Sequence, residues 1–294
     1  MRPDDVIASL GWDLRPVGAP LAGAASGAAV LRVRADSADA VLKLTRAGRG
    51  QPDARRELTF YRTLAGQLPI RTPRLLRHAD DDRVTAILLS AHPPTPPARE
   101  WGRSAWLGLA EELAALHATP VPEHHAWLDT PWLQRILDRP PVDAARSYWS
   151  ATVTARQLGA VLDAPAALAA AVAATGEGLL HGDCHVGNLL HGGDRLVWAD
   201  WQVTGVGSRA VDLAFLCSRA HADGADLPYA AMHDTYAARG GLDGGLLRRS
   251  LIAAELGVLL FGWPGYATRR DPAARDRLTR RLITLIDHWR SWTP

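Results

Sequence analysis

Four prolines within five residues divide the sequence into two parts of different character. Proline fixes its own backbone angle and cannot donate a hydrogen bond, so this segment neither continues a strand nor enters the interior of a helix. Short apolar runs typical of strands precede the segment, and long helical patterns follow it. The sequence therefore predicts an α+β chain with two domains, over residues 1–92 and 93–294. The prolines are Pro93, Pro94, Pro96 and Pro97.

The first part carries the pattern of a small sheet with one helix. Short apolar or alternating runs at residues 31–33, 41–44 and 84–89 predict three strands. Between the second and third of them, residues 53–68 repeat apolar residues at helical spacing, and Glu57 falls on the same inward face. A carboxylate on an inward face requires a partner, because an unpaired buried charge is costly.

Helical patterns dominate the second part. They predict helices over residues 104–116, 164–174, 246–260 and 275–289. The exception is the stretch 178–212, in which short apolar runs alternate with Gly-rich turns.

Composition and charge exclude several classes of protein. With 294 residues and 47% hydrophobic residues, the chain can bury two cores. A formal net charge of +2 is too small for a general nucleic-acid binder. The two cysteines are too few for a disulfide framework, and the longest apolar stretch, 251–263, is interrupted by Glu255. We therefore expect a cytoplasmic protein, monomeric or weakly dimeric, with neither nucleic acid nor membrane as partner.

The sequence holds a single lysine, Lys43, among 33 basic residues, and a single asparagine, Asn188. The many Gly, Ala and Pro residues indicate a GC-rich coding background that removes lysine and asparagine codons. Arginine replaces lysine freely at solvated surfaces, but its planar fork does not replace a compact ammonium at a phosphate site. The survival of these two residues predicts that both are functional.

The most specific motif lies in the exceptional stretch and reads His-Gly-Asp-Cys-His-Val-Gly-Asn-Leu-Leu over residues 181–190. Asp183 and Asn188 lie five residues apart in a loop, and Asp200 follows a short apolar run. Phosphoryl transfer needs such a set. One carboxylate lies beside the acceptor hydroxyl, while an amide oxygen and a second carboxylate hold magnesium against the nucleotide phosphates.

This motif resembles the catalytic loop of the aminoglycoside phosphotransferase-type kinases, and Ala199-Asp200-Trp201 resembles their metal-binding segment. The resemblance implies a bilobal protein-kinase-like fold, with a small antiparallel-sheet N-lobe that carries one helix and a larger helical C-lobe. It also implies an enzyme that uses ATP and Mg²⁺ to phosphorylate an alcohol group of a small molecule.

The resemblance assigns roles to five residues. It implies that Asp183 orients or deprotonates the acceptor hydroxyl and that Asn188 and Asp200 bind magnesium. It also implies that Lys43 contacts the α- and β-phosphates and that Glu57 is its ion-pair partner. The pairing accounts for the inward-facing carboxylate.

The same resemblance places further residues near the nucleotide. Gly23 and Ser26, in a Gly- and Ala-rich run before the lysine, would approach the phosphates. Ser90 and His92 would lie in the hinge that contacts adenine, mainly through the backbone. Asp212 would brace the catalytic loop without taking part in the chemistry. Gln202 stands where many relatives carry a second acid, which leaves open how many magnesium ions bind.

Two other site chemistries fit parts of the motif. His181, Asp183 and His185, with His191 and Asp200 nearby, also form a pattern for a zinc or manganese hydrolase. That interpretation leaves the lone lysine, the lone asparagine and the inward-facing carboxylate unexplained. A thiol nucleophile formed by Cys184 and the adjacent histidine lacks a third, orienting group.

A third alternative is a nucleotide-binding protein without catalytic activity. It is disfavoured because the sequence keeps every residue that the resemblance requires for transfer. Binding of ATP without turnover of any acceptor would favour it.

The charge of the helical part bears on the acceptor. Residues 213–294 hold eight acids and eleven arginines, and residues 98–176 hold eight acids and six arginines. A polycationic acceptor would need a strongly anionic pocket. We therefore expect an antibiotic as acceptor and a role in resistance. The charge count favours a neutral or mildly charged compound such as a nucleoside or macrolide, and an aminoglycoside is the other antibiotic class that we expect. The alternative is a metabolite kinase of the same fold acting on homoserine, an amino alcohol or a sugar.

Overall fold

The computed structural model describes residues 6–8, 10–19, 21, 28–266 and 272–292. Gly23 and Ser26 lie outside the described residues. By its internal contacts the chain divides into two compact units: a sheet unit, Met1–Pro94 with Leu189–Val203, and a helical unit, Thr95–Asn188 with Thr204–Pro294.

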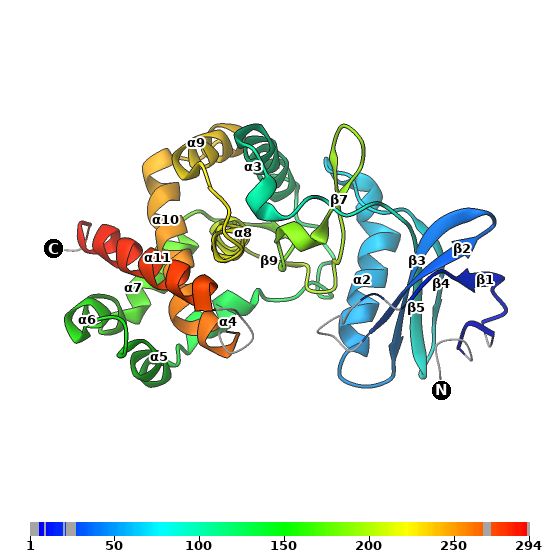
Figure 1. The fold of residues 1–294 in the computed structure, drawn as a ribbon, viewed down its shortest axis with the longest axis horizontal. Helices are drawn as coiled ribbons and strands as arrows, with labels where there is room; N and C mark the ends of the chain where they lie inside the picture. The colour runs from blue at the N-terminus through cyan, green and yellow to red at the C-terminus, as the bar shows by residue number, and fades with distance from the viewer. Residues whose placement is uncertain (1–5, 9, 20, 22–27, 267–271, 293–294) are drawn as a thin grey trace. The chain divides into compact units, whose positions relative to one another are not determined.

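The sheet unit is built on five antiparallel strands in the order β1-β2-β3-β5-β4 (Figure 1). The strands are β1 (Leu14–Pro16), β2 (Ala29–Ala35), β3 (Ala38–Arg46), β4 (Leu75–Asp80) and β5 (Val84–Ser90). The three predicted strands correspond to β2, β3 and β5. The sequence prediction lacked the two edge strands: β1 spans three residues, and every second residue of β4 is exposed.

The two faces of this sheet differ in what covers them. Leu42 and Leu44 of β3 join a buried apolar cluster that includes Val6 and Ile7 from the start of the chain. Because side chains alternate along a strand, Lys43 points to the opposite face of the sheet. Its backbone pairs with Val30 of β2 and Ile87 of β5. The helix α2 (Gln51–Thr63) belongs to the same unit (Figure 1).

The predicted helix over 53–68 ends earlier than expected. Leu64 leaves the helical region, with φ at −121°, and a short 3₁₀ turn, η1 (Ala65–Gln67), follows. Glu57 lies on the buried face of α2 and is 2% exposed. The inward orientation that the pattern predicted for this carboxylate is therefore confirmed.

The segment Leu189–Val203 packs with the sheet unit, whereas the sequence prediction assigned it to the second domain. It contains the hairpin of β7 (Leu189–His191) and β8 (Leu196–Trp198). The backbone N–H of Trp198 donates to the carbonyl of Arg71, and that of His191 donates to Pro93. Beyond the hairpin, the buried ring of Trp201 stacks on Phe60 of α2, with centroids 4.1 Å apart. These contacts, which connect residues far apart in the sequence, hold the segment in the sheet unit.

The helical unit packs its helices around a central one, α8 (Ala210–Ala222), of whose thirteen residues ten are buried. Four predicted helices are present, but the third ends at Gly257, after which the chain continues as a π turn, η4 (Val258–Gly262). The other helices of this unit, α4, α5, α6, α8 and α9, were not predicted from periodicity. The remaining bounds are η2 (Ala98–Glu100), α3 (Arg103–His117), α4 (Trp132–Asp138), α5 (Val142–Trp149), α6 (Ala155–Leu162), α7 (Pro165–Ala173), β6 (Glu177–Leu180), η3 (Val186–Asn188), β9 (Gly205–Ser208), α9 (Tyr229–Gly240), α10 (Gly244–Gly257), η5 (Trp263–Gly265) and α11 (Pro272–Arg290).

The elements of both units confirm the predicted α+β class: an antiparallel five-stranded sheet with one long helix, and a mainly helical remainder. Among the described residues, no helix has the length and apolar character that crossing a membrane requires.

Candidate active site

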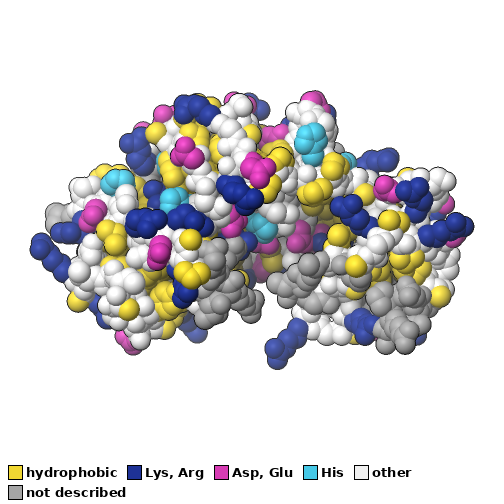
Figure 2. Space-filling view, viewed as in Figure 1, with side chains coloured by type: hydrophobic (Ala, Val, Ile, Leu, Met, Phe, Trp, Pro, Cys, Tyr) yellow, Lys and Arg dark blue, Asp and Glu magenta, His cyan; other side chains and the backbone are white. Residues whose placement is uncertain are grey.

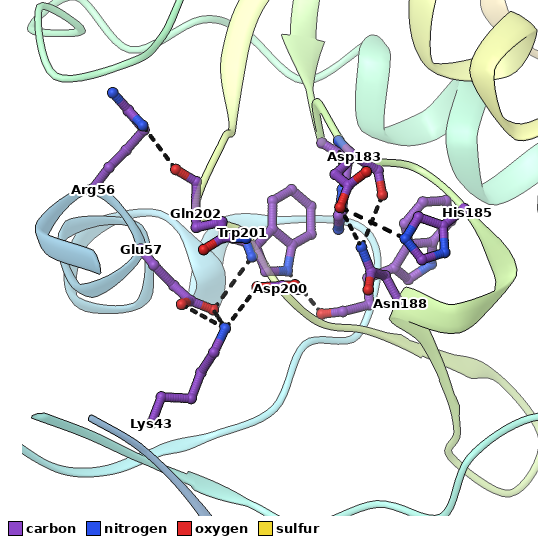
Figure 3. A network of polar contacts seen from close by, with 11 residues as sticks. Lys43, Arg56, Glu57, Asp183, His185, Asn188, Asp200, Trp201 and Gln202 are labelled. Atoms are coloured by element: carbon purple, nitrogen blue, oxygen red, sulfur yellow. Dashed lines mark hydrogen bonds and ion pairs between the residues drawn. The ribbon is translucent and has the colours of Figure 1, made fainter. Parts of the chain in front are cut away.

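In the sheet unit, the lone lysine lies at the centre of an ion-pair cluster (Figure 3). The Nζ of Lys43 donates to both carboxylate oxygens of Glu57, each at 2.7 Å, and to Oδ1 of Asp200 at 2.6 Å. The three residues come from β3, from α2 and from the turn after β8. The pairing of Lys43 with Glu57 that the resemblance implied is therefore present, and Asp200 joins it.

Burial and charge determine how this cluster is ionised. The side chains of Lys43 and Glu57 are 11% and 2% exposed. Burial alone would lower the pKa of Lys43, but the two carboxylates outweigh it and hold that pKa above its usual value. For Glu57, burial raises the pKa, while Lys43 and the backbone N–H of Trp201 oppose that rise. Lys43 therefore remains a cation throughout the physiological pH range.

Asp200 occupies an unusual backbone conformation. Its φ of 68° lies in the left-handed region, which few residues other than glycine adopt and which aspartate and asparagine tolerate best. The neighbouring backbone is fixed by α2: the N–H of Trp201 donates to Oε1 of Glu57 at 3.3 Å, and Arg56 donates to the carbonyl of Gln202 at 2.8 Å. Asp200 is 28% exposed, so its carboxylate is accessible to a ligand.

In the helical unit, Asp183 and Asn188 lie together in the loop after β6 (Figure 3). The amide nitrogen of Asn188 donates to the carbonyl of Asp183 at 2.9 Å and to its Oδ2 at 3.2 Å. The amide oxygen of Asn188 is thereby directed away from this carboxylate, because the two atoms lie on opposite sides of the amide carbon. The Nε2 of His185 lies 3.6 Å from the same Oδ2.

These neighbours keep Asp183 ionised. Burial alone would raise its pKa, but the nearby His185, His181 and Asn188 outweigh that effect and lower it below the usual value. Asp183 is therefore a carboxylate at neutral pH, able to accept a hydrogen bond from a hydroxyl group.

A buried relay of side chains supports the loop. Asp212, at the start of α8, accepts hydrogen bonds from the backbone N–H groups of His181, at 2.7 Å, and Gly182, at 3.0 Å. The Nε2 of His117 lies 3.2 Å from the same carboxylate, and the Nδ1 of His117 bonds the hydroxyl of Tyr236. Asp212 is 1% exposed and braces the loop, as the resemblance implied.

The sequence analysis did not identify His117 and Tyr236 as supports of this loop. His117 occupies a position on the buried stripe of α3, where a polar residue indicates a specific partner. That partner lies 95 positions away in the sequence, so the pattern of α3 alone does not identify it.

Removal of the Asp212 carboxylate is expected to destabilise the protein. In Asp212→Ala the two loop N–H groups lose their acceptor inside the protein, at a cost of about 2–4 kcal/mol in the free energy of unfolding. Urea unfolding measures that change. Asp287→Ala, which removes a largely exposed carboxylate of the same unit, serves as control. Equal stability of Asp212→Ala and the unchanged protein would contradict the bracing role.

The two hinge residues named from the resemblance already have partners within the sheet unit. Ser90 Oγ accepts from the backbone N–H of Arg74 at 2.9 Å and lies 3.1 Å from Nε2 of His92. The N–H of Ala91 donates to the carbonyl of Asp39 at 3.3 Å. Beside this segment is a cavity of about 270 Å³, lined by Val17, Arg32, Val33, Arg34, Asp39, Ala40, Ala91, His92 and Pro93.

The alternative chemistries gain no support. No three His, Cys, Asp or Glu side chains of the described part of the chain come together as a metal site. The Nδ1 atoms of His181 and His185 instead accept hydrogen bonds from backbone N–H groups of their own loop. Cys184 is buried, and burial together with nearby carboxylates holds its pKa well above the usual value, so it stays a thiol rather than a nucleophilic thiolate.

Comparison with known proteins identifies the fold and the family. A model of the phosphotransferase enzyme family matches residues 17–252. A microcompartment-associated aminopropanol kinase superposes with a TM-score of 0.69 at 16% identity, over 99% of this chain and 98% of that one. A macrolide 2′-phosphotransferase from Brachybacterium faecium has a TM-score of 0.62 at 20% identity, over 95% and 96% of the two chains.

A third solved structure, an aminoglycoside phosphotransferase from Streptomyces rimosus, has a TM-score of 0.53 at 22% identity, over 86% of this chain and 96% of that one. A search of curated protein sequences found no match. These likenesses confirm the kinase-like fold that the motifs predicted.

Proposed function

This chain belongs to the phosphotransferase enzyme family, and we propose that it transfers the γ-phosphoryl group of ATP to a hydroxyl group of a small molecule. The observation that carries the proposal is the cluster in which a single buried ammonium bonds Glu57 and Asp200. A structural ion pair needs one carboxylate, whereas a lysine held between two is suited to exchange one of its partners for a phosphate oxygen.

The candidate residues of the sheet unit would hold the nucleotide. Lys43 would bind the α- and β-phosphates while Glu57 fixes its position, since a point charge on a flexible stem needs a fixed anchor. Gly23 and Ser26 would approach the phosphates, and the hinge at Ser90 and His92 would hold adenine. Because the side chain of Ser90 bonds a backbone N–H, the hinge contacts would come from the main chain.

Asp183 would act on the acceptor. Its carboxylate accepts a hydrogen bond from the acceptor hydroxyl, which aligns the oxygen for attack on the γ-phosphorus. As the new P–O bond forms and the bond to ADP breaks, the hydroxyl proton passes to Asp183. The lowered pKa makes this residue a weak base, so orientation of the hydroxyl is the larger part of its contribution.

The proposed magnesium ligands are of the chemical kind that this ion prefers. Asn188 offers an amide oxygen and Asp200 a carboxylate, and Mg²⁺ prefers such hard oxygen ligands together with water and phosphate. When bound, the ion would neutralise charge on the phosphates. Gln202 adds an amide where a second carboxylate would add a negative charge.

We propose a neutral or mildly charged acceptor, such as a macrolide or nucleoside antibiotic, so that phosphorylation would confer resistance. On the visible face of the helical unit, basic and acidic side chains are interspersed rather than gathered into an anionic patch (Figure 2). The likeness to a macrolide 2′-phosphotransferase agrees with this class of acceptor. The likeness to an aminopropanol kinase favours the second candidate, a metabolite kinase that acts on an amino alcohol.

A panel of acceptors separates these candidates. ADP formation is measured with erythromycin, uridine, 1-amino-2-propanol, homoserine and kanamycin, each titrated at saturating ATP and magnesium. The proposal expects the highest kcat/KM with uridine, which is neutral, or with erythromycin, whose one amino group carries a single positive charge. The highest value with the amino alcohol or homoserine would establish the second candidate, and the highest value with kanamycin would overturn the charge argument.

A further inference from the structure

The central helix of the helical unit carries a partly exposed aromatic ring, Phe215. In α8 every residue is buried except Phe215, Arg219 and His221. Phe215 and Arg219 are four residues apart and therefore share one face of the helix. Trp106, Trp149 and Trp289 of the same unit are 2% exposed or less, whereas Phe215 keeps partial exposure.

Phe215 connects two other half-buried rings. Its ring packs edge to face against Trp132 of α4, with centroids 5.6 Å apart, and against His185, with centroids 6.5 Å apart. The three rings therefore form a continuous aromatic strip, defined here as Trp132, Phe215 and His185. All three belong to the helical unit and all retain solvent exposure.

The strip ends at the carboxylate that receives the acceptor. His185 is both the last ring of the strip and the neighbour of Asp183, with Nε2 3.6 Å from Oδ2. A molecule lying along the strip would therefore place one of its ends beside Asp183.

The ring of Trp132 packs closely against a glycine. A Cβ atom at Gly262 would lie 2.8 Å from two atoms of the Trp132 ring, a distance that side chains do not tolerate. The ring thus packs directly on the backbone of the π turn after α10. A fixed ring binds a ligand at a lower cost in conformational entropy than a mobile one.

We infer that the aromatic strip of Trp132, Phe215 and His185 is the acceptor platform, and that it takes a hydroxylated compound with a broad apolar or planar ring body. The inference rests on the proposed transfer to a small-molecule hydroxyl and names the acceptor class for that site. The ring body covers the strip and removes three aromatic surfaces from water, while the hydroxyl extends to Asp183. A short amino alcohol has no body that spans three rings.

The test measures how Phe215→Ala and Trp132→Ala change KM for the acceptor and KM for ATP. With erythromycin as the ring-bearing probe, KM for the acceptor is expected to rise about tenfold or more in each variant, which corresponds to about 1.4 kcal/mol or more. KM for ATP is expected to change much less, because the strip lies on the acceptor side of the reaction. Phe215→Leu, which keeps an apolar side chain of similar volume, is expected to give an intermediate KM and guards against a loss of folding.

Trp292→Ala is the matched control, because Trp292 is an exposed aromatic residue, 38% accessible, outside the strip. Its kinetic constants are expected to equal those of the unchanged protein. Acceptor KM values that stay unchanged in both strip variants, or phosphorylation of 1-amino-2-propanol alone, would overturn the inference. Failure of the proposed function is distinguishable, since the unchanged protein would then form no phosphorylated product with any compound of the panel.

Discussion

Asp183→Ala is expected to lower kcat by about a hundredfold to ten-thousandfold while the affinity for ATP stays near that of the unchanged protein. The substitution removes the carboxylate that would hold the acceptor hydroxyl, and the residues assigned to ATP lie elsewhere. The Asn188 amide keeps one of its two acceptors, the Asp183 carbonyl. Steady-state kinetics measures kcat, and calorimetric titration measures ATP binding.

Asp183→Asn shows whether kcat depends on the charge of the Asp183 side chain or on its shape. The amide has nearly the same size as the carboxylate but takes up no proton, so its kcat is expected to fall almost as far as that of the alanine variant. A kcat within tenfold of the unchanged protein in both variants would show that Asp183 has no part in the transfer.

Lys43→Arg is expected to lower kcat/KM for ATP by about a hundredfold, or about 2.7 kcal/mol of transition-state stabilisation. One nitrogen atom of Lys43 lies within 2.7 Å of three carboxylate oxygens. A guanidinium group is wider and planar, and its five donors are spread over a fork that does not converge on one point. The substitution keeps the charge, so the loss measures geometry alone.

The control for this variant is Arg83→Lys, at a largely exposed cation between β4 and β5 of the same unit. It is expected to leave kcat/KM unchanged. Thermal unfolding of both variants shows whether the buried substitution has also weakened the sheet unit. Near-normal kcat/KM in a folded Lys43→Arg protein would mean that the lone lysine is an accident of composition.

Local patterns were sufficient to predict the fold class and the central part of the sheet unit. Residues 41–44 alternate as a buried strand does, and Glu57 lies on the inward face of its helix, so two short patterns place both residues, while their pairing came from the resemblance. The edge strand β4 was not predicted because its Arg77, His78 and Asp80 give it the composition of a loop. The helices α4, α5 and α6 have at most eight residues, too short for a clear period.

Some residues of the candidate site were likewise predicted from the sequence, and others were found only in the structure. Asp183, Asn188 and Asp200 fall within one motif and its continuation, so spacing alone finds them. The Asp212 relay and the aromatic strip join residues that are 30 to 119 positions apart, and only the packed structure reveals such contacts. His185 shows most clearly what the sequence alone could not predict. The sequence analysis weighed it as a metal ligand or a partner of Cys184, whereas its ring faces Phe215 and its Nε2 lies near Asp183.

The central claim is that the γ-phosphoryl group of ATP passes to an acceptor hydroxyl, and analysis of the products tests it most directly. The protein is incubated with ATP, magnesium and the best acceptor of the panel, and the products are identified by phosphorus NMR and mass spectrometry. We expect equal amounts of ADP and of an acceptor phosphate monoester, with neither formed at a comparable rate by Asp183→Ala. Unmodified acceptor across the whole panel, with ADP either absent or accompanied only by inorganic phosphate, would contradict the claim.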